Sequence, residues 1–133
     1  MKAYISCPLG ESIIKVQQVA GRLISLGYEP TYFIRGTSYE DKDVRDCNLF
    51  VLISSGGEFD FNRSAMTLGC GKELDLAHSL NKKLYIAYWK ATKSLNIYPI
   101  NISRLEEGRV LGMSKSYLQP IPKQLIINNY PIY

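Results

Sequence analysis

The sequence predicts one α/β domain with a doubly wound sheet of about five parallel strands in the order 2-1-3-4-5 and helices on both faces. Two apolar runs, at residues 49–53 and 84–89, are typical of strands that are buried on both faces. Strand-like and helix-like segments alternate with short connections, which indicates right-handed crossovers and a parallel sheet. A chain of 133 residues is long enough for one such core, so we expect a single domain over residues 1–133.

The first half of this pattern runs from residue 2 to residue 34. Residues 2–6 form the first predicted strand, and apolar residues then recur at helical spacing up to residue 26. Gly27 follows where a helix would end. Residues 28–34 form the second predicted strand, which Pro30 interrupts near its start.

The next segments continue the alternation. A short, highly charged helix is expected over residues 39–47, and the third strand over residues 48–54. A long glycine-rich and polar loop follows, and a helix is expected from Thr67 to about Asn81. Residues 84–89 then form the fourth strand.

The pattern weakens after the fourth strand. Residues 95–102 predict a fifth strand, in which Pro99 favours an edge position, and residues 102–113 have a mixed helical pattern. The tail, residues 117–133, is rich in proline and apolar residues. We expect it to pack on the core or on a second subunit, and we expect a homodimer.

Composition excludes several classes of function. The net charge of +4 is dispersed, which suits a small acidic ligand better than a nucleic acid polymer. Three cysteines without metal or redox spacing and one histidine predict no metal site, and we expect no cofactor. No apolar run is long enough to span a membrane, and a strand begins almost at the N-terminus, so we expect neither a membrane anchor nor a signal peptide. These features predict a cytoplasmic protein.

Glu73 is the unusual residue of the 67–81 helix. Winding the helix at ~100° per residue places Glu73 on the same arc as Leu74, Leu76 and Ala77. A carboxylate within an apolar stripe is costly unless it is paired or has a function. The alternative is a first-turn glutamate that reaches solvent past the helix end.

A ligand site is expected beyond the carboxyl ends of strands 1 and 3, where the strand order reverses in a flavodoxin-like sheet. Two loops meet there, at residues 6–12 and 54–71. Their hydroxyls and backbone N–H groups, next to a helix start, suit a phosphate. The candidate binding residues are Ser6, Pro8, Leu9, Gly10, Ser54, Ser55, Thr67, Gly69 and Gly71.

The segment Thr67-Leu-Gly-Cys-Gly-Lys-Glu73-Leu-x-x-Ala77 resembles a motif of the nucleoside 2'-deoxyribosyltransferase-like superfamily. It is most similar to that of the nucleoside 5'-monophosphate N-glycosidases, including the 2'-deoxynucleoside 5'-phosphate N-hydrolases. Tyr4-Ile-Ser-Cys-Pro-Leu-Gly10 resembles the first strand and phosphate-side loop of the family. The resemblance covers about residues 2–89 and not the tail.

This resemblance implies cleavage of an N-glycosidic bond, with Glu73 as the nucleophile at the anomeric carbon. It implies that Thr67, Gly69 and the first loop hold the 5'-phosphate. It also implies an assisting acid from the preceding helix, for which Asp43 and Glu40 are both candidates. Ser54 and Ser55 stand where deoxyribosyltransferases often carry an aspartate, which bears on the substrate more than on the reaction.

The same residues also fit other functions. The helix that carries Glu73 also resembles the catalytic helix of TIR-type NAD-cleaving domains, and transfer of the sugar to a second base is a further alternative. A module that binds a nucleotide without cleaving it would suit the serines at positions 54 and 55.

Overall fold

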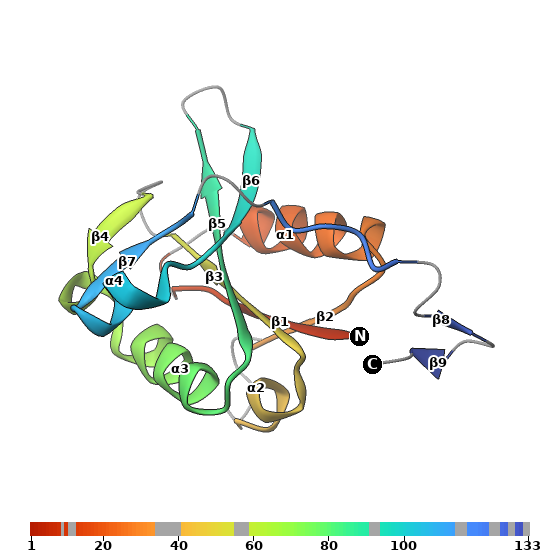
Figure 1. The fold of residues 1–133 in the computed structure, drawn as a ribbon. Coiled ribbons are helices and arrows are strands. Elements are labelled where there is room, and N and C mark those ends of the chain that lie inside the picture. The colour runs from red at the N-terminus through yellow and green to blue at the C-terminus, as the bar shows by residue number, and fades with distance from the viewer. Residues whose placement is uncertain are drawn as a thin grey trace.

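A five-stranded sheet forms the centre of the molecule (Figure 1). The computed structural model describes residues 1–8, 10, 13–33, 41–54, 59–90, 94–113, 117–122, 126–127 and 130–131. The sheet order is β2-β1-β3-β5-β6. Its strands are β1 (Lys2–Ser6), β2 (Glu29–Tyr32), β3 (Leu49–Ile53), β5 (Lys83–Trp89) and β6 (Leu95–Pro99).

The α/β class is confirmed, and so is a sheet that is mostly parallel. When only the five strands of this sheet are numbered in chain order, their arrangement is 2-1-3-4-5, as predicted. One expectation is wrong, because β6 pairs antiparallel with β5, from Tyr85 opposite Pro99 to Trp89 opposite Leu95. A parallel connection needs a crossover of about a dozen residues, and only residues 90–94 separate the two strands. Pro99 does lie in an edge strand, as predicted.

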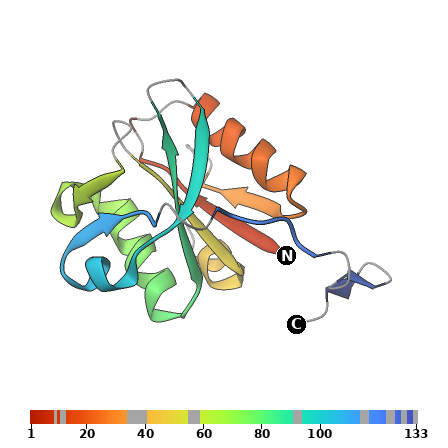
Figure 2. The same ribbon diagram turned by 45° about the horizontal axis from the view of Figure 1, so that its top comes forward.

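The two faces of the sheet have separate apolar cores. The helix α1 (Ile13–Ser25) covers one face, where Val16, Val19 and Leu23 pack on side chains from β1 and β3. The chain leaves this helix through Gly27, whose φ of +94° suits glycine. The other face is covered by α2 (Lys42–Asp46) and α3 (Leu68–Ser79), and Figure 2 shows α1 apart from these two helices.

A small second sheet extends the layer that contains α3. β4 (Asp60–Asn62) pairs antiparallel with β7 (Arg109–Leu111), and a 3-10 turn, η2 (Arg63–Ala65), joins β4 to the start of α3. The short helix α4 (Ile102–Glu106) precedes β7. The predicted loop therefore contains a strand, and only the first residues of the predicted 102–113 helix are helical. Phe59 packs its ring on Tyr88 and Tyr98, which fixes this layer to the sheet.

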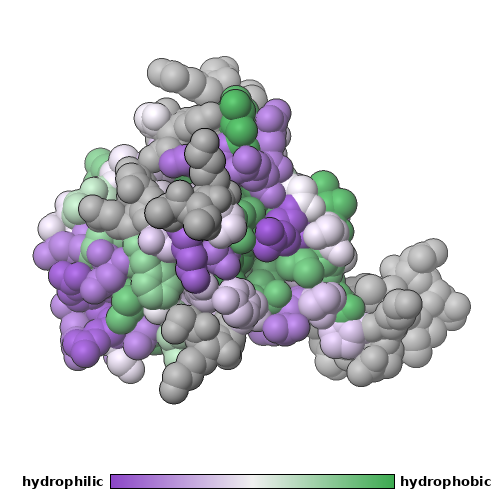
Figure 3. Space-filling view, turned by 90° about the horizontal axis from the view of Figure 1, so that it is seen from above, coloured by the Kyte–Doolittle hydropathy of each residue, from purple (hydrophilic) through white to green (hydrophobic). Residues whose placement is uncertain are grey.

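Part of the predicted tail packs on the core of its own chain. Leu118 is buried beside α1, its backbone N–H donates to the Ile97 carbonyl at 3.2 Å, and the Ile121 N–H donates to the Leu26 carbonyl at 3.0 Å. A two-stranded hairpin, β8 (Ile126–Ile127) with β9 (Tyr130–Pro131), follows. Hydrophilic and hydrophobic residues intermingle on the surface seen from above (Figure 3). Among the described helices, none is both long and apolar enough to cross a bilayer.

Candidate functional site

The helix α3 begins with a side-chain cap. Thr67 has extended backbone angles and its hydroxyl accepts a hydrogen bond from the Cys70 backbone N–H at 3.4 Å. Such a cap satisfies one of the four N–H groups that lack partners at a helix start. The Gly71 N–H donates to the Thr67 carbonyl at 2.9 Å, which begins the helical ladder. The N–H groups of the first two residues, Leu68 and Gly69, have no partner within the helix, because they precede its first hydrogen-bonded turn.

Glu73 points into the protein, as its position in the apolar stripe predicts. The residue is 8% exposed, and Cys70, Leu74 and Ala77 of the same helix are also buried. Both oxygens of its carboxylate accept hydrogen bonds from β1. The Ser6 hydroxyl donates to Oε1 at 2.8 Å, and the Tyr4 hydroxyl donates to Oε2.

These two hydrogen bonds explain how a carboxylate can be buried at this position. Removing a charged carboxylate from water costs several kcal/mol unless hydrogen bonds replace its hydration. Tyr4 and Ser6 alternate with Ile5, so both side chains leave β1 on the face that α3 covers. The Tyr4 ring is fixed by stacking on Phe50, with 6.0 Å between ring centroids. The carboxylate is therefore held in one orientation by a rigid strand.

Cys70 lies one turn before Glu73 and belongs to the same cluster. Burial raises the pKa of the Cys70 thiol, hydrogen bonds with the Ser6 and Thr67 side chains lower it, and the charge of Glu73 raises it further. The thiol is therefore not activated by the nearby helix start. Cys70 nevertheless interacts with the side chains of Ser6 and Thr67 and with the charge of Glu73. The capped start of α3 and the carboxylate therefore belong to one cluster.

The carboxyl ends of the neighbouring strands lie on either side of this cluster. Ser6 is paired with Leu52 in the sheet. Ser54 follows Leu52 by two residues, so its side chain lies on the same face of the sheet, and it is fully buried. On the other side, Ile5 is paired with Tyr32. The next residue, Phe33, follows the end of β2 and is 36% exposed.

The predicted glycines differ in their surroundings. A Cβ atom added at Gly10 or Gly69 would meet nothing within 4 Å, so both backbones leave room for a ligand. A Cβ atom at Gly71 would lie 3.3 Å from an Arg63 guanidinium nitrogen. Arg63 donates to the Gly71 carbonyl at 3.0 Å and pairs with Asp75, so the space beside Gly71 is already occupied by protein.

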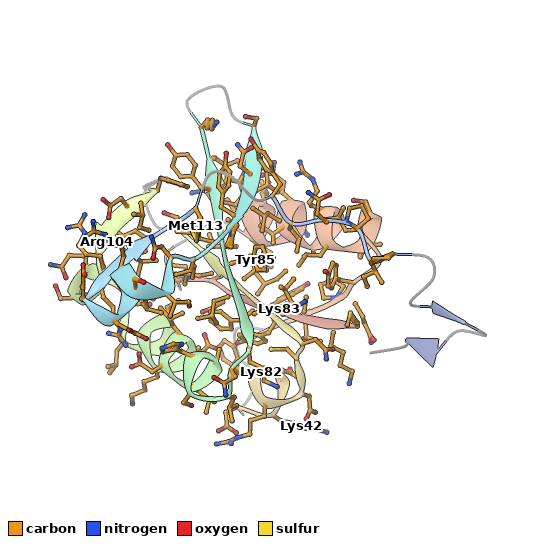
Figure 4. The ribbon with its side chains drawn as sticks, viewed as in Figure 1. Lys42, Lys82, Lys83, Tyr85, Arg104 and Met113 are labelled. Carbon is orange, nitrogen blue, oxygen red and sulfur yellow. The ribbon has the colours of Figure 1, made fainter. Side chains whose placement is uncertain are left out.

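Of the remaining candidates, Pro8 and Asp43 are described by the structure, and the others lie outside the described residues. Pro8 is buried in the loop after β1. Asp43 is exposed on α2, a helix whose end lies beside Lys82, since Lys82 Nζ donates to the Arg45 carbonyl at 2.7 Å. Figure 4 shows Lys42 and Lys82 at this end of the molecule. Glu40, Leu9 and Ser55 fall outside the described residues, so the choice of assisting acid stays a prediction.

One residue of this site was not identified from the sequence, namely Tyr4, which donates to Glu73. Alternation along residues 2–6 was a usable signal, because it puts Tyr4 and Ser6 on one face.

Within the described ranges, no group of three or more His, Cys, Asp or Glu side chains could hold a metal ion. The arrangement instead offers a positioned carboxylate, hydroxyl groups and a helix start. No protein-family model and no curated protein matches the chain significantly.

Proposed function

We propose that this protein is an N-glycosidase that cleaves a nucleoside 5'-monophosphate to the free base and the sugar 5-phosphate. The observation that carries the proposal is the buried Glu73, whose two carboxylate oxygens accept hydrogen bonds from Tyr4 and Ser6 of β1. A carboxylate that is fixed at the carboxyl end of a sheet, next to a helix start, suits attack on a sugar bound there.

The proposed reaction has two steps. A Glu73 oxygen bonds to C1' of the sugar while the bond from C1' to the base nitrogen breaks, and the base leaves with that electron pair and takes up a proton. Water then adds at C1' and gives up a proton, which balances the proton taken up by the base; the bond from Glu73 to C1' breaks, and Glu73 is restored as a carboxylate. This is the course of a retaining glycosidase, with an oxocarbenium-like transition state in each step. The hydrogen bonds from Tyr4 and Ser6 hold the carboxylate in position throughout.

The phosphate is proposed to bind at the start of α3. The N–H groups of Leu68 and Gly69, the positive end of the helix dipole and the Thr67 hydroxyl all favour an anion there. Room at Gly69 and Gly10 allows a phosphate to approach the backbone. The predicted flavodoxin-like strand order places both loops at the point where ligands bind in such sheets.

The proposal is tested by incubating the protein with a panel of nucleoside 5'-monophosphates and measuring free base. Wild type should release base from at least one of them, and Glu73→Gln should lose at least 10²-fold of that rate with its fold intact. The matched control is Glu106→Gln, an exposed glutamate on α4, which should retain full activity. Asp43→Asn and Glu40→Gln identify which acid assists.

Binding measurements test the phosphate site separately from bond cleavage. Thr67→Ala should weaken the binding of nucleoside monophosphates and leave the binding of unphosphorylated nucleosides unchanged. Unaltered affinity for the monophosphates would contradict the phosphate assignment.

Product analysis decides between cleavage activities of the same carboxylate. Adding a second base tests for sugar transfer, and NAD tests for release of nicotinamide. Tight nucleotide binding with no release of base from any of these substrates would show a binding module and refute the enzyme proposal.

A further inference from the structure

The outer side of α1 has an unusual composition for an exposed helix. Val16, Val19 and Leu23 face the sheet, whereas Ile13, Ile14 and Ile24 are 57%, 60% and 62% exposed. Amphipathic helices on protein surfaces normally show polar and charged residues on their outer side. These three isoleucines give the solvent side of the helix an apolar character that an isolated surface helix does not need.

The exposed residues follow a coiled-coil pattern. Ile14, Gln17, Gly21 and Ile24 are separated by three, four and three residues, which is the spacing of a and d positions over two heptads. The neighbouring e and g positions carry no charge either. They are Ile13, Gln18, Ala20 and Ser25. The two basic residues of the helix, Lys15 and Arg22, both take b positions outside this seam.

We propose that this face of α1 binds α1 of a second copy of the chain, with the two helices antiparallel across a two-fold axis. The spacing of three, four and three is the same in both directions, so the seam complements itself, as an isologous interface requires. Ile14 then packs on the partner's Ile24, and Gln17 lies opposite the partner's Gly21. A Cβ atom at Gly21 would meet nothing within 4 Å, so this position leaves a space that a glutamine side chain can enter.

The charges of the chain favour this face over others. Each copy carries a net charge of +4, so a contact surface without charged side chains avoids close like-charge pairs between two copies. The seam provides one. Lys15 is directed to the Trp89 ring, 5.4 Å from its centroid, and Gln18 accepts a hydrogen bond from the Trp89 indole at 2.9 Å. Both side chains are thereby turned toward the body of their own subunit.

The size of the seam determines how strong the contact is. A helix of 13 residues is about 20 Å long. A single pair of such helices buries less than the ~800 Å² per partner of a standard interface. The dimer should therefore dissociate reversibly, with a dissociation constant on the order of micromolar. This interface does not depend on the proposed function and does not use the C-terminal tail.

Sedimentation velocity of the full chain over about 1 to 100 µM protein tests the proposal. Wild type should shift from monomer to dimer across this range, and Ile14→Lys with Ile24→Lys should raise the dissociation constant at least tenfold. Gly21→Leu should do the same without harming the monomer, because the added side chain meets no atom there and leucine favours a helix more than glycine does. Ile102→Lys, at an exposed isoleucine on α4, is the control and should leave the dimer unchanged.

Disulfide formation tests the orientation of the helices. In a Cys7→Ser background, an equimolar mixture of the Ile14→Cys and Ile24→Cys proteins should form mainly the mixed disulfide under mild oxidation. Preferential 14–14 and 24–24 disulfides would refute the antiparallel arrangement. A wild-type protein that stays monomeric, or a dimer that survives both lysine substitutions, would overturn the proposal.

Discussion

The contact between Tyr4 and Glu73 gives the most direct physical test of the candidate site, because it needs no substrate. Tyr4→Phe removes only the hydroxyl that donates to Oε2 of the carboxylate. The ring should remain, because it is 2% exposed and stacks on Phe50. The variant therefore leaves one oxygen of a buried carboxylate without this donor while core packing is preserved.

The expected magnitude follows from this geometry. A hydrogen bond to a charged group contributes about 1.5–3 kcal/mol, and an unsatisfied buried acceptor costs a similar amount. Tyr4→Phe should therefore lower the free energy of unfolding by about 2 kcal/mol, which lowers Tm by on the order of 5–10 °C for a domain of this size. Ser6→Ala removes the donor to the other oxygen and should have an effect of similar size.

A double-mutant cycle measured by urea unfolding isolates the contact. The cycle uses wild type, Tyr4→Phe, Glu73→Gln and the double variant. We expect a coupling free energy of about 1.5–3 kcal/mol, since both groups are buried and in direct contact. A coupling below ~0.5 kcal/mol would refute the contact between the two side chains. A parallel cycle with Ser6→Ala tests the second donor.

Three further predictions concern packing, backbone and titration. Gly112→Ala should destabilise the protein by about 1–3 kcal/mol in urea unfolding, because the new Cβ atom would lie 2.5 Å from Phe59 Cε2; no loss would show that the ring is not held there. Gly27→Ala should cost about 1 kcal/mol at a φ of +94°, whereas Gly21→Ala, inside a helix with open space around it, should stabilise by a similar amount. Burial raises the pKa of Cys70 above its ordinary 9.0. The stability that Cys70 contributes is therefore complete below pH 9 and lost as the pH rises through the folded-state pKa, so Cys70→Ala should flatten the decline of Tm above pH 9. An unchanged slope would contradict this assignment.

Local patterns determined most of the fold. The buried runs 49–53 and 84–89 became β3 and β5, and Gly27 ends α1 at the expected position. The direction of the last strand was predicted wrongly, although the short connection at residues 90–94 contained the information. The pairing of β4 with β7 was missed, because it joins segments about 50 residues apart in a region without strand periodicity.

The candidate site was predicted only in part, because its contacts also join segments that lie far apart in the sequence. Helical periodicity placed Glu73 in an apolar arc but left open a glutamate that reaches solvent past the helix end, and the structure shows that the residue is buried. The residues that hold its carboxylate lie about 70 positions away on β1, and no local pattern links them to the helix. The packing of Arg63 against Gly71 likewise depends on the β4–β7 layer, which the sequence did not reveal.

We propose that the Glu73 carboxylate forms a bond to the anomeric carbon of a nucleotide sugar. Mass spectrometry of the protein, quenched rapidly with acid during turnover of the best nucleoside 5'-monophosphate, tests for this bond. We expect a sugar phosphate adduct on the peptide that contains Glu73 in wild type and no adduct in Glu73→Gln. Release of free base at the wild-type rate by Glu73→Gln would contradict it.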